Sequence, residues 1–114
     1  MTRRIVFHKG HFIDFYSKLP EGVKRKIQYV FELIKQVEMV PKKFFAPMTG
    51  CEGLFEIRVE YESNIYRTFC CFDEGQLVVL FNGFQKKSQK TPIKEIDKAM
   101  RLKKEYFEFK KNKS

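Results

Sequence analysis

Residues 54–61 alternate in polarity, and no other stretch of this 114-residue chain constrains its fold as strongly. One side of an extended segment here would carry only apolar or aromatic residues, namely Phe55, Ile57, Val59 and Tyr61. The other side would carry Leu54, Glu56, Arg58 and Glu60. A period of two residues is typical of a strand with one buried face, so the segment predicts a half-buried β-strand.

A two-residue turn at 63–64 would fold this strand against a second strand. Pairing across that turn predicts Glu60 opposite Arg67 and Arg58 opposite Phe69. A register shifted by one residue would turn the Arg67 guanidinium onto the apolar face, where an unpaired charge is costly. The register with Arg67 opposite Glu60 is therefore preferred.

A second turn at 74–75 predicts a third strand, in which Phe69 pairs with Leu80 and Arg67 pairs with Asn82. Residues that lie opposite each other across paired strands share a face of the sheet. On this pairing one face would hold Arg58, Arg67, Asn82, Phe84 and Lys86.

The segment before the hairpin predicts one strand and two helices. A short strand is expected at 5–8, and aromatic residues recur at helical spacing over 12–19. Apolar residues at i, i+4, i+7 and i+11 then predict an amphipathic helix of about four turns over 23–37. The stretch 41–53, which contains Pro and Gly, is expected to be a loop.

A final helix is expected over about residues 92–109, with Thr91 as its N-cap and Pro92 at its first position. Its expected core contacts are Ile93, Ile96, Met100 and Phe107. The chain is therefore predicted to be one α+β domain spanning residues 1–114. A short N-terminal strand and two helices would pack on a small antiparallel-rich sheet, followed by the C-terminal helix and a basic tail at about 110–114.

The charge of the chain is strongly positive and unevenly spread. The formal charge is +9, and residues 86–114 hold eleven Lys or Arg against four acids, so this segment carries +7 of the total. A small domain this basic is typical of proteins that meet nucleic acid or an acidic protein partner. The alternative is that the charge serves only solubility.

The cysteines and histidines offer little for a metal site or a disulfide framework. Cys70 and Cys71 are adjacent on a predicted strand, so their side chains point to opposite faces, and His8 and His11 lie far away in the sequence. We expect no metal, no cofactor, and cysteines that serve as small core residues in a reducing compartment. With no membrane span and no signal peptide expected, the predicted location is cytoplasmic.

The candidate site is a group of basic and aromatic residues. The sequence holds no Ser-His-Asp set, glycine-rich phosphate loop or carboxylate cluster for two-metal catalysis. Such a basic group suits RNA cleavage, because RNA carries its own nucleophile, the 2′-hydroxyl, and fixed cations can stabilise charge on the phosphate. The candidate catalytic residues are Arg67, Lys86 and Lys87, and the candidate substrate-binding residues are Arg58, Asn82, Phe84 and Lys90.

Each of these residues also has a purely structural interpretation. Arg67 could simply pair with Glu60 across the strands, and the two acids that flank Arg58 could neutralise it. Phe84 could belong to the core, which is the commoner place for an aromatic residue on a strand. The lysines are ordinary one by one, and only their crowding near Arg67 favours a binding site.

Three segments together resemble the HigB-type, phage Gp49-like branch of the RelE/ParE toxin superfamily. They are a leucine-aromatic-glutamate-aliphatic-arginine strand at 54–58, a tyrosine-arginine pair at 66–67, and a glycine-phenylalanine-x-lysine-lysine stretch at 83–87 that leads into lysine-threonine-proline at 90–92. The resemblance is close from residue 54 to about residue 102.

The resemblance implies the toxin of a type II toxin–antitoxin pair, with a RelE-like α+β fold. Such toxins typically cleave mRNA on the translating ribosome without a metal, which inhibits translation, and a helix-turn-helix antitoxin neutralises them. The family roles imply that Arg67 binds the scissile phosphate and that Lys86 and Lys87 act as basic groups at the end of the last strand. A similar role is implied for Arg58.

The chain departs from many RelE-type toxins near its C-terminus. No His follows His11, and Tyr106 stands outside any motif, so the general base is left open. Three alternatives follow: a ParE-like gyrase inhibitor, a non-catalytic toxin-like binding module, or a generic RNA-binding protein.

Overall fold

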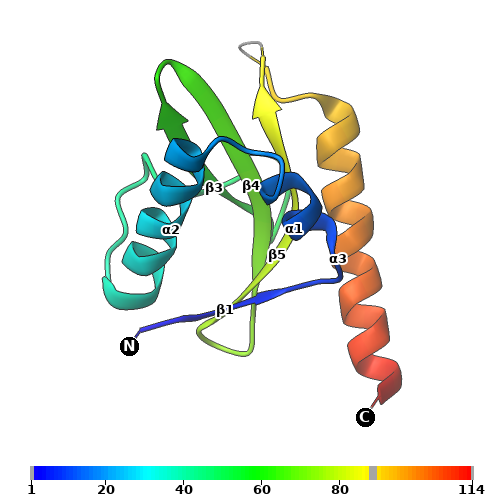
Figure 1. The fold of residues 1–114 in the computed structure, drawn as a ribbon. Coiled ribbons are helices and arrows are strands. Elements are labelled where there is room, and N and C mark those ends of the chain that lie inside the picture. Colours follow the sequence, from blue (N-terminus) through cyan, green and yellow to red (C-terminus); the bar gives the residue numbers. More distant parts are fainter. Residues whose placement is uncertain (1, 88–89, 114) are drawn as a thin grey trace.

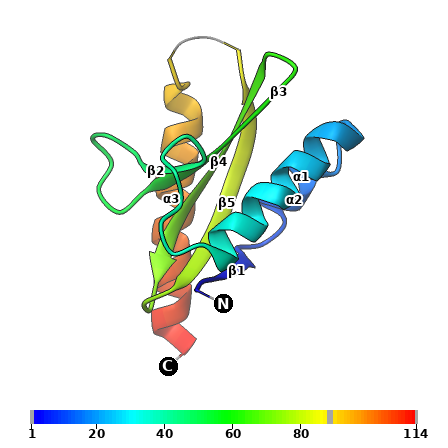
Figure 2. The same cartoon turned by 90° about the vertical axis from the view of Figure 1, so that its left-hand side faces the viewer.

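The framework of the protein is a mixed β-sheet with helices on both faces (Figures 1 and 2). A computed structural model describes residues 2–87 and 90–113, and within them the five strands lie in the order β1-β5-β4-β3-β2. Strand β1 runs parallel to β5, and the other neighbours are antiparallel, which confirms the predicted α+β class. The elements are β1 (Arg4–Phe7), α1 (His11–Tyr16), α2 (Glu21–Gln36), β2 (Phe45–Pro47), β3 (Phe55–Tyr61), β4 (Asn64–Asp73), β5 (Leu77–Lys86) and α3 (Ile93–Lys113).

Two hydrophobic clusters lie on opposite faces of the sheet. Helices α1 and α2 cover the first cluster and α3 covers the second, and Figure 1 places α2 and α3 on opposite sides of the strands. Cys70 belongs to the first cluster and Cys71 to the second, as adjacent strand residues require. Burial raises the pKa of Cys70 well above its usual value and that of Cys71 to about 11, so both thiols stay protonated core residues at neutral pH.

Helix α2 follows the predicted apolar spacing. Its buried residues are Val23, Ile27, Val30, Phe31 and Ile34, which form one stripe against the sheet. The 41–53 segment, however, is not entirely loop, because β2 pairs with β3 inside it. Strand β2 lies at the edge of the sheet, where a strand can contain proline. It has only three residues and includes Pro47, so its sequence shows no alternation of polarity.

The turn between β3 and β4 lies one residue earlier than predicted. Glu62 and Ser63 both have positive φ (48° and 66°), as the two central residues of a type I′ turn require. Arg58 therefore lies opposite Arg67 rather than Phe69, and the predicted pairing of Arg67 with Glu60 is wrong. Each partner is displaced by two residues, so every side chain keeps its predicted face.

The predicted pairing of β4 with β5 is also wrong, because of a β-bulge. Arg67 lies opposite Phe84 rather than Asn82, and Cys70 rather than Phe69 lies opposite Leu80. Strand β5 accommodates one extra residue across this irregularity, and such an insertion changes the direction of the side chains beyond it. The bulge lets both Phe81 and Asn82 reach the α3 side of the sheet.

Gly83 follows the bulge and touches α1. A Cβ atom built at this position would overlap the ring of Phe15. The glycine of the 83–87 motif therefore permits a close approach between β5 and α1 rather than a special turn.

Helix α3 packs through a different stripe from the predicted one. Ile93 is 74% exposed and Met100 is 37% exposed, whereas Ala99 and Leu102 are buried. Ile96 and Phe107 are partly buried against the second cluster, as predicted. The small Ala99 side chain allows the helix axis to approach the sheet, which turns Ile93 and Met100 outward.

Both ends of α3 also differ from the prediction. The helix begins at Ile93, and the carbonyl of Pro92 accepts the Ile96 amide at 3.2 Å, so the predicted start is early by one residue. It continues to Lys113, so the predicted basic tail is helical to that residue. Within residues 2–87 and 90–113, no helix is long and apolar enough to cross a membrane.

Candidate functional site

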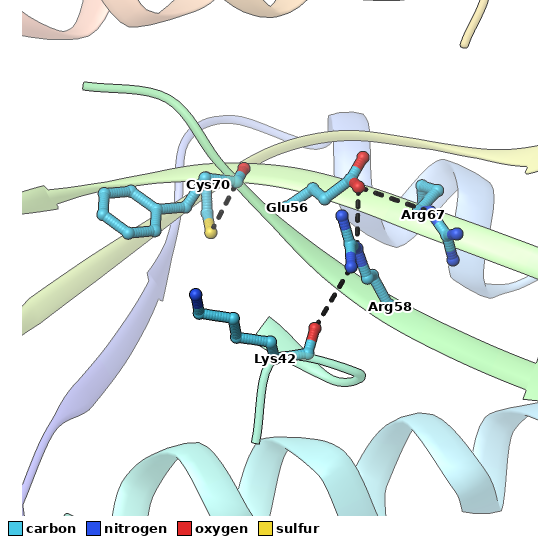
Figure 3. Close-up of polar contacts among 6 residues, drawn as sticks. Lys42, Glu56, Arg58, Arg67 and Cys70 are labelled. Carbon is cyan, nitrogen blue, oxygen red and sulfur yellow. Dashed lines mark hydrogen bonds and ion pairs between the residues drawn. The ribbon is translucent and has the colours of Figure 1, made fainter. Parts of the chain in front are cut away.

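Two arginines and one glutamate meet on the central strands β3 and β4. Arg58 and Arg67 lie opposite each other, and Glu56 lies two residues before Arg58 on the same face of β3. The Nε atom of Arg58 donates to Oε1 of Glu56 at 2.8 Å, and Nε of Arg67 lies 3.6 Å from the same oxygen (Figure 3). A single carboxylate therefore contacts both guanidinium groups, and the charge of Glu60 also acts on Arg67.

Arg67 is largely buried but poorly paired. Its side chain is 11% exposed, and its Nε and Nη1 atoms are buried without a hydrogen-bond partner among the described residues. Burial is the main cause that lowers the pKa of Arg67, and the charge of Glu56 opposes that effect. An arginine stays protonated in proteins, so the site holds a largely buried cation, and among the described residues its one ion pair is with Glu56.

Glu56 is the member of this site that the sequence analysis did not propose. Its side chain is 5% exposed, and its Oε2 atom has no hydrogen-bond partner within the described chain. The signal was present, because Glu56 precedes Arg58 by two residues on an alternating strand and so must share its face. The backbone carbonyl of Lys42 also accepts from Nη1 of Arg58 at 3.2 Å, so two acceptors fix the position of that guanidinium (Figure 3).

The lysines proposed from the sequence lie at the same end of the sheet. Lys86 is partly buried and lies opposite Ile65. Arg67 and Lys86 are therefore diagonal neighbours across β4 and β5, and such residues are about 7–8 Å apart. Lys87 and Lys90 are exposed after the end of β5. Both views place the β3–β4 turn, the end of β5 and the start of α3 at this end of the molecule (Figures 1 and 2). Residues 88–89 of the predicted basic loop lie outside the described residues.

Phe84 and Asn82 occupy structural positions. Phe84 lies opposite Arg67 but is only 8% exposed, and its ring packs on Phe69 at a centroid distance of 5.5 Å. This agrees with the core interpretation that the sequence left open. Asn82 is buried and donates to the backbone carbonyl and the Oε1 atom of Glu95, at 3.1 and 3.0 Å, so it joins the bulge to the start of α3.

Tyr106 lies far from the arginines. Its hydroxyl donates to Oδ2 of the buried Asp73 at 2.7 Å, and Lys110 contacts both oxygens of that carboxylate at 2.8 Å. Asp73 is six residues from Arg67 along β4, which corresponds to about 20 Å. Tyr106 therefore cannot act as the general base at Arg67 in this structure, and its pKa, which burial and Asp73 raise to about 12, also disfavours that role.

The histidines lie beside α3. His8 is buried, its Nε2 atom lies 2.7 Å from Oε1 of Glu105, and its ring stands edge-on to Tyr106. Burial, followed by the charge of Lys98, lowers the pKa of His11. Within the described ranges, no three His, Cys, Asp or Glu side chains form a group that could hold a metal ion.

Replacing Tyr106 with phenylalanine is expected to destabilise the fold without changing the arginine site. Burial alone would raise the pKa of Asp73, but hydrogen bonds from Lys110 and Tyr106 lower it overall. The loss should be about 1.5 kcal/mol at pH 7, the lower end for a hydrogen bond to a charged group, because Lys110 remains.

The Tyr106 effect should depend on pH. A lowered carboxyl pKa contributes stability above the unfolded value of about 3.9, and this contribution is lost as the pH falls through the folded value. Urea unfolding at pH 7 and pH 3 would check this, with a smaller difference in stability between the wild-type and Tyr106→Phe proteins at pH 3 than at pH 7. An equal difference at both pH values would contradict the assigned hydrogen bond.

Comparison with known proteins identifies the fold and the family of this chain. The fold is that of an α+β protein similar to RelE. One chain of the archaeal RelE–RelB complex from Pyrococcus horikoshii OT3 superposes with a TM-score of 0.53 at 15% sequence identity, over 80% of this chain and 100% of that chain. The sequence profile of the phage-derived protein Gp49-like family matches residues 14–104, so the chain belongs to that family. The resemblance to the Gp49-like family found in the sequence is thereby confirmed, although no curated protein matches the chain.

Proposed function

We propose that this protein is the toxin of a type II toxin–antitoxin pair and that it cleaves mRNA on the translating ribosome. Membership of the Gp49-like family and the RelE-like fold support the toxin role. The observation that carries the cleavage proposal is Arg67, a largely buried cation opposite Arg58 whose Nε and Nη1 atoms make no hydrogen bond among the described residues. A buried charge that lacks hydrogen bonds is costly, so a site that keeps one is a candidate for binding an anion.

The proposed reaction uses the 2′-hydroxyl of the RNA as nucleophile. The 2′-oxygen forms a bond to phosphorus, the bond from phosphorus to the 5′-oxygen breaks, and the upstream fragment ends in a 2′,3′-cyclic phosphate. Arg67 would donate to the non-bridging oxygens through the part of its guanidinium that reaches the surface, and negative charge develops on those oxygens in the transition state. No metal is required for this step, because the guanidinium supplies the charge.

The supporting residues have separate proposed roles. Arg58, held by Glu56 and the Lys42 carbonyl, would bind a second phosphate oxygen without reorganising. Lys86 and Lys87 would carry out the two proton transfers, one accepting the proton of the 2′-hydroxyl and the other donating a proton to the 5′-oxygen. Asn82 would act by holding the bulge against α3, and Lys90 would attract the RNA backbone.

A neutralising antitoxin is the proposed protein partner. The similar fold occurs in a RelE–RelB complex, and the family resemblance favours a helix-turn-helix antitoxin here. A target on the translating ribosome also implies a cytoplasmic location for this chain.

Wild-type protein added to a reconstituted translation reaction is expected to cut a reporter mRNA only when ribosomes are present. Primer extension would locate the cuts, and a 2′,3′-cyclic phosphate on the upstream fragment would identify the nucleophile. Intact mRNA together with DNA breaks after induction in cells would favour a gyrase inhibitor instead. Intact mRNA without toxicity would favour a module that only binds its partner.

A further inference from the structure

A pocket of about 340 Å³ opens beside the arginine site, near the free part of the β3 edge. Its lining comes from three parts of the chain: helix α2, the segment before β2, and β3 itself. The lining residues are Lys26, Lys43, Phe44, Arg58 and Glu60. The volume falls within the range of about 300–1,000 Å³ that is typical of small-molecule sites.

Arg58 connects this pocket to the proposed cleavage site. Its side chain lines the pocket and also bonds Glu56, which contacts Arg67. The Arg58 amide donates to the Phe44 carbonyl at 2.7 Å, so the segment before β2 is fixed to β3 by its backbone. A nucleotide in the pocket would therefore adjoin the phosphate held by Arg67.

The lining offers the three kinds of contact that a nucleotide needs. Lys26, Lys43 and Arg58 supply positive charge for a phosphate. Phe44 supplies an aromatic ring, with the Lys43 ammonium 5.0 Å from its centroid and the Tyr29 ring edge-on at 6.2 Å. Single-stranded RNA is commonly bound by this combination of stacking on an aromatic ring and cationic contacts.

Glu60 adds the ability to distinguish bases. In the part of the chain that the structure describes, its carboxylate makes no hydrogen bond or ion pair, and it is exposed at the pocket. Guanine presents two adjacent N–H donors, at N1 and N2, which match the two oxygens of a carboxylate. Uracil presents one N–H between two carbonyl oxygens, and these would repel a carboxylate.

We infer that this pocket is a nucleotide subsite that stacks a base on Phe44 and prefers guanine through Glu60. The inference rests on the proposed function, because it takes the substrate to be RNA. It adds a second binding position beside the cleaved bond and gives the enzyme a source of sequence preference.

Titration of the full-length protein with GMP, AMP, CMP and UMP, followed by amide chemical shifts, would test the subsite. GMP is expected to shift the amides of Lys43, Phe44 and Glu60 and to bind about tenfold or more tightly than UMP, since a bidentate pair discriminates by that much. Glu60→Gln should bring GMP and UMP within about twofold of each other. Phe44→Leu should weaken binding of all four nucleotides.

Lys43→Ala and Lys104→Ala form a matched pair for the phosphate contact. Both remove one exposed lysine, but Lys104 lies on α3 away from the pocket, so only Lys43→Ala should weaken GMP binding. Equal affinity for GMP and UMP, or shifts elsewhere than the pocket, would overturn the inference. Because this assay needs neither ribosomes nor cleavage, its result is independent of whether the protein proves to be a nuclease.

Discussion

Arg67→Ala is expected to reduce ribosome-dependent cleavage of mRNA by about 10²–10³-fold, the usual effect of removing one preorganised donor from a developing oxyanion. Arg67 lies opposite Arg58 and its side chain is 11% exposed, so its guanidinium charge can act on a phosphate bound at the surface of the site. Primer extension on a reporter mRNA, with wild-type and variant protein side by side, would measure the loss. Thermal unfolding followed by circular dichroism should still show one cooperative transition.

Two further variants make the Arg67 result specific. Arg101→Ala removes the same side chain from the exposed face of α3 and should leave cleavage within about twofold of wild type, because surface substitutions away from a site have small effects. Arg67→Lys keeps the charge but loses the planar guanidinium that can donate to two oxygens at once. Its cleavage activity should therefore lie between those of Arg67→Ala and the wild type. Cleavage by Arg67→Ala at the wild-type rate would refute the assignment of the site.

Phe69→Ala is expected to cost about 3–5 kcal/mol of unfolding free energy, the range for deleting a buried aromatic side chain. Phe69 is 0% exposed and packs on Phe84 inside the cluster beneath α3. A loss of this size is a large part of the stability of a small domain, which is about 5–15 kcal/mol. Urea denaturation of both proteins would measure it.

Phe109→Ala is the matched control for the core substitution. Phe109 is 58% exposed near the end of α3, so its replacement should change the unfolding free energy by no more than about 0.5 kcal/mol. A similar loss of unfolding free energy in both variants would contradict the placement of Phe69 in the buried core and of Phe109 at the surface.

The faces of the strands could be predicted from the sequence, but the residue pairs could not. The alternation at 54–61 required Glu56 and Arg58 to share a face, and this held when the register proved different. The turn itself uses Glu62 and Ser63 at positive φ, a conformation for which Gly or Asn is the usual signal. Asn64, the residue with that signal, is instead the first residue of β4.

The environment of each site residue depended on tertiary contacts that local patterns do not encode. The bulge brings Asn82 to the α3 side, and the packing of Ala99 against the sheet decides which side of α3 is buried. Arg67 lies on β4, which has β5 on one side and β3 on the other. Arg67 and Arg58 could therefore be proposed as site residues from the sequence. That the buried Arg67 nitrogens lack hydrogen bonds, and that Glu56 contacts both arginines, could be seen only in the structure.

The parallel pairing of β1 with β5 has a consequence for the synthesis of the chain. Arg4 pairs with Leu77 and Phe7 with Leu80, so β1 has no partner strand until residues 77–80 have been translated. Contacts between such distant residues form late, and domains fold as their chain emerges from the ribosome. For a protein proposed to attack translating ribosomes, this order leaves the proposed site without β5 and Lys86 until that strand has emerged, so the ribosome that makes the protein holds an incomplete site.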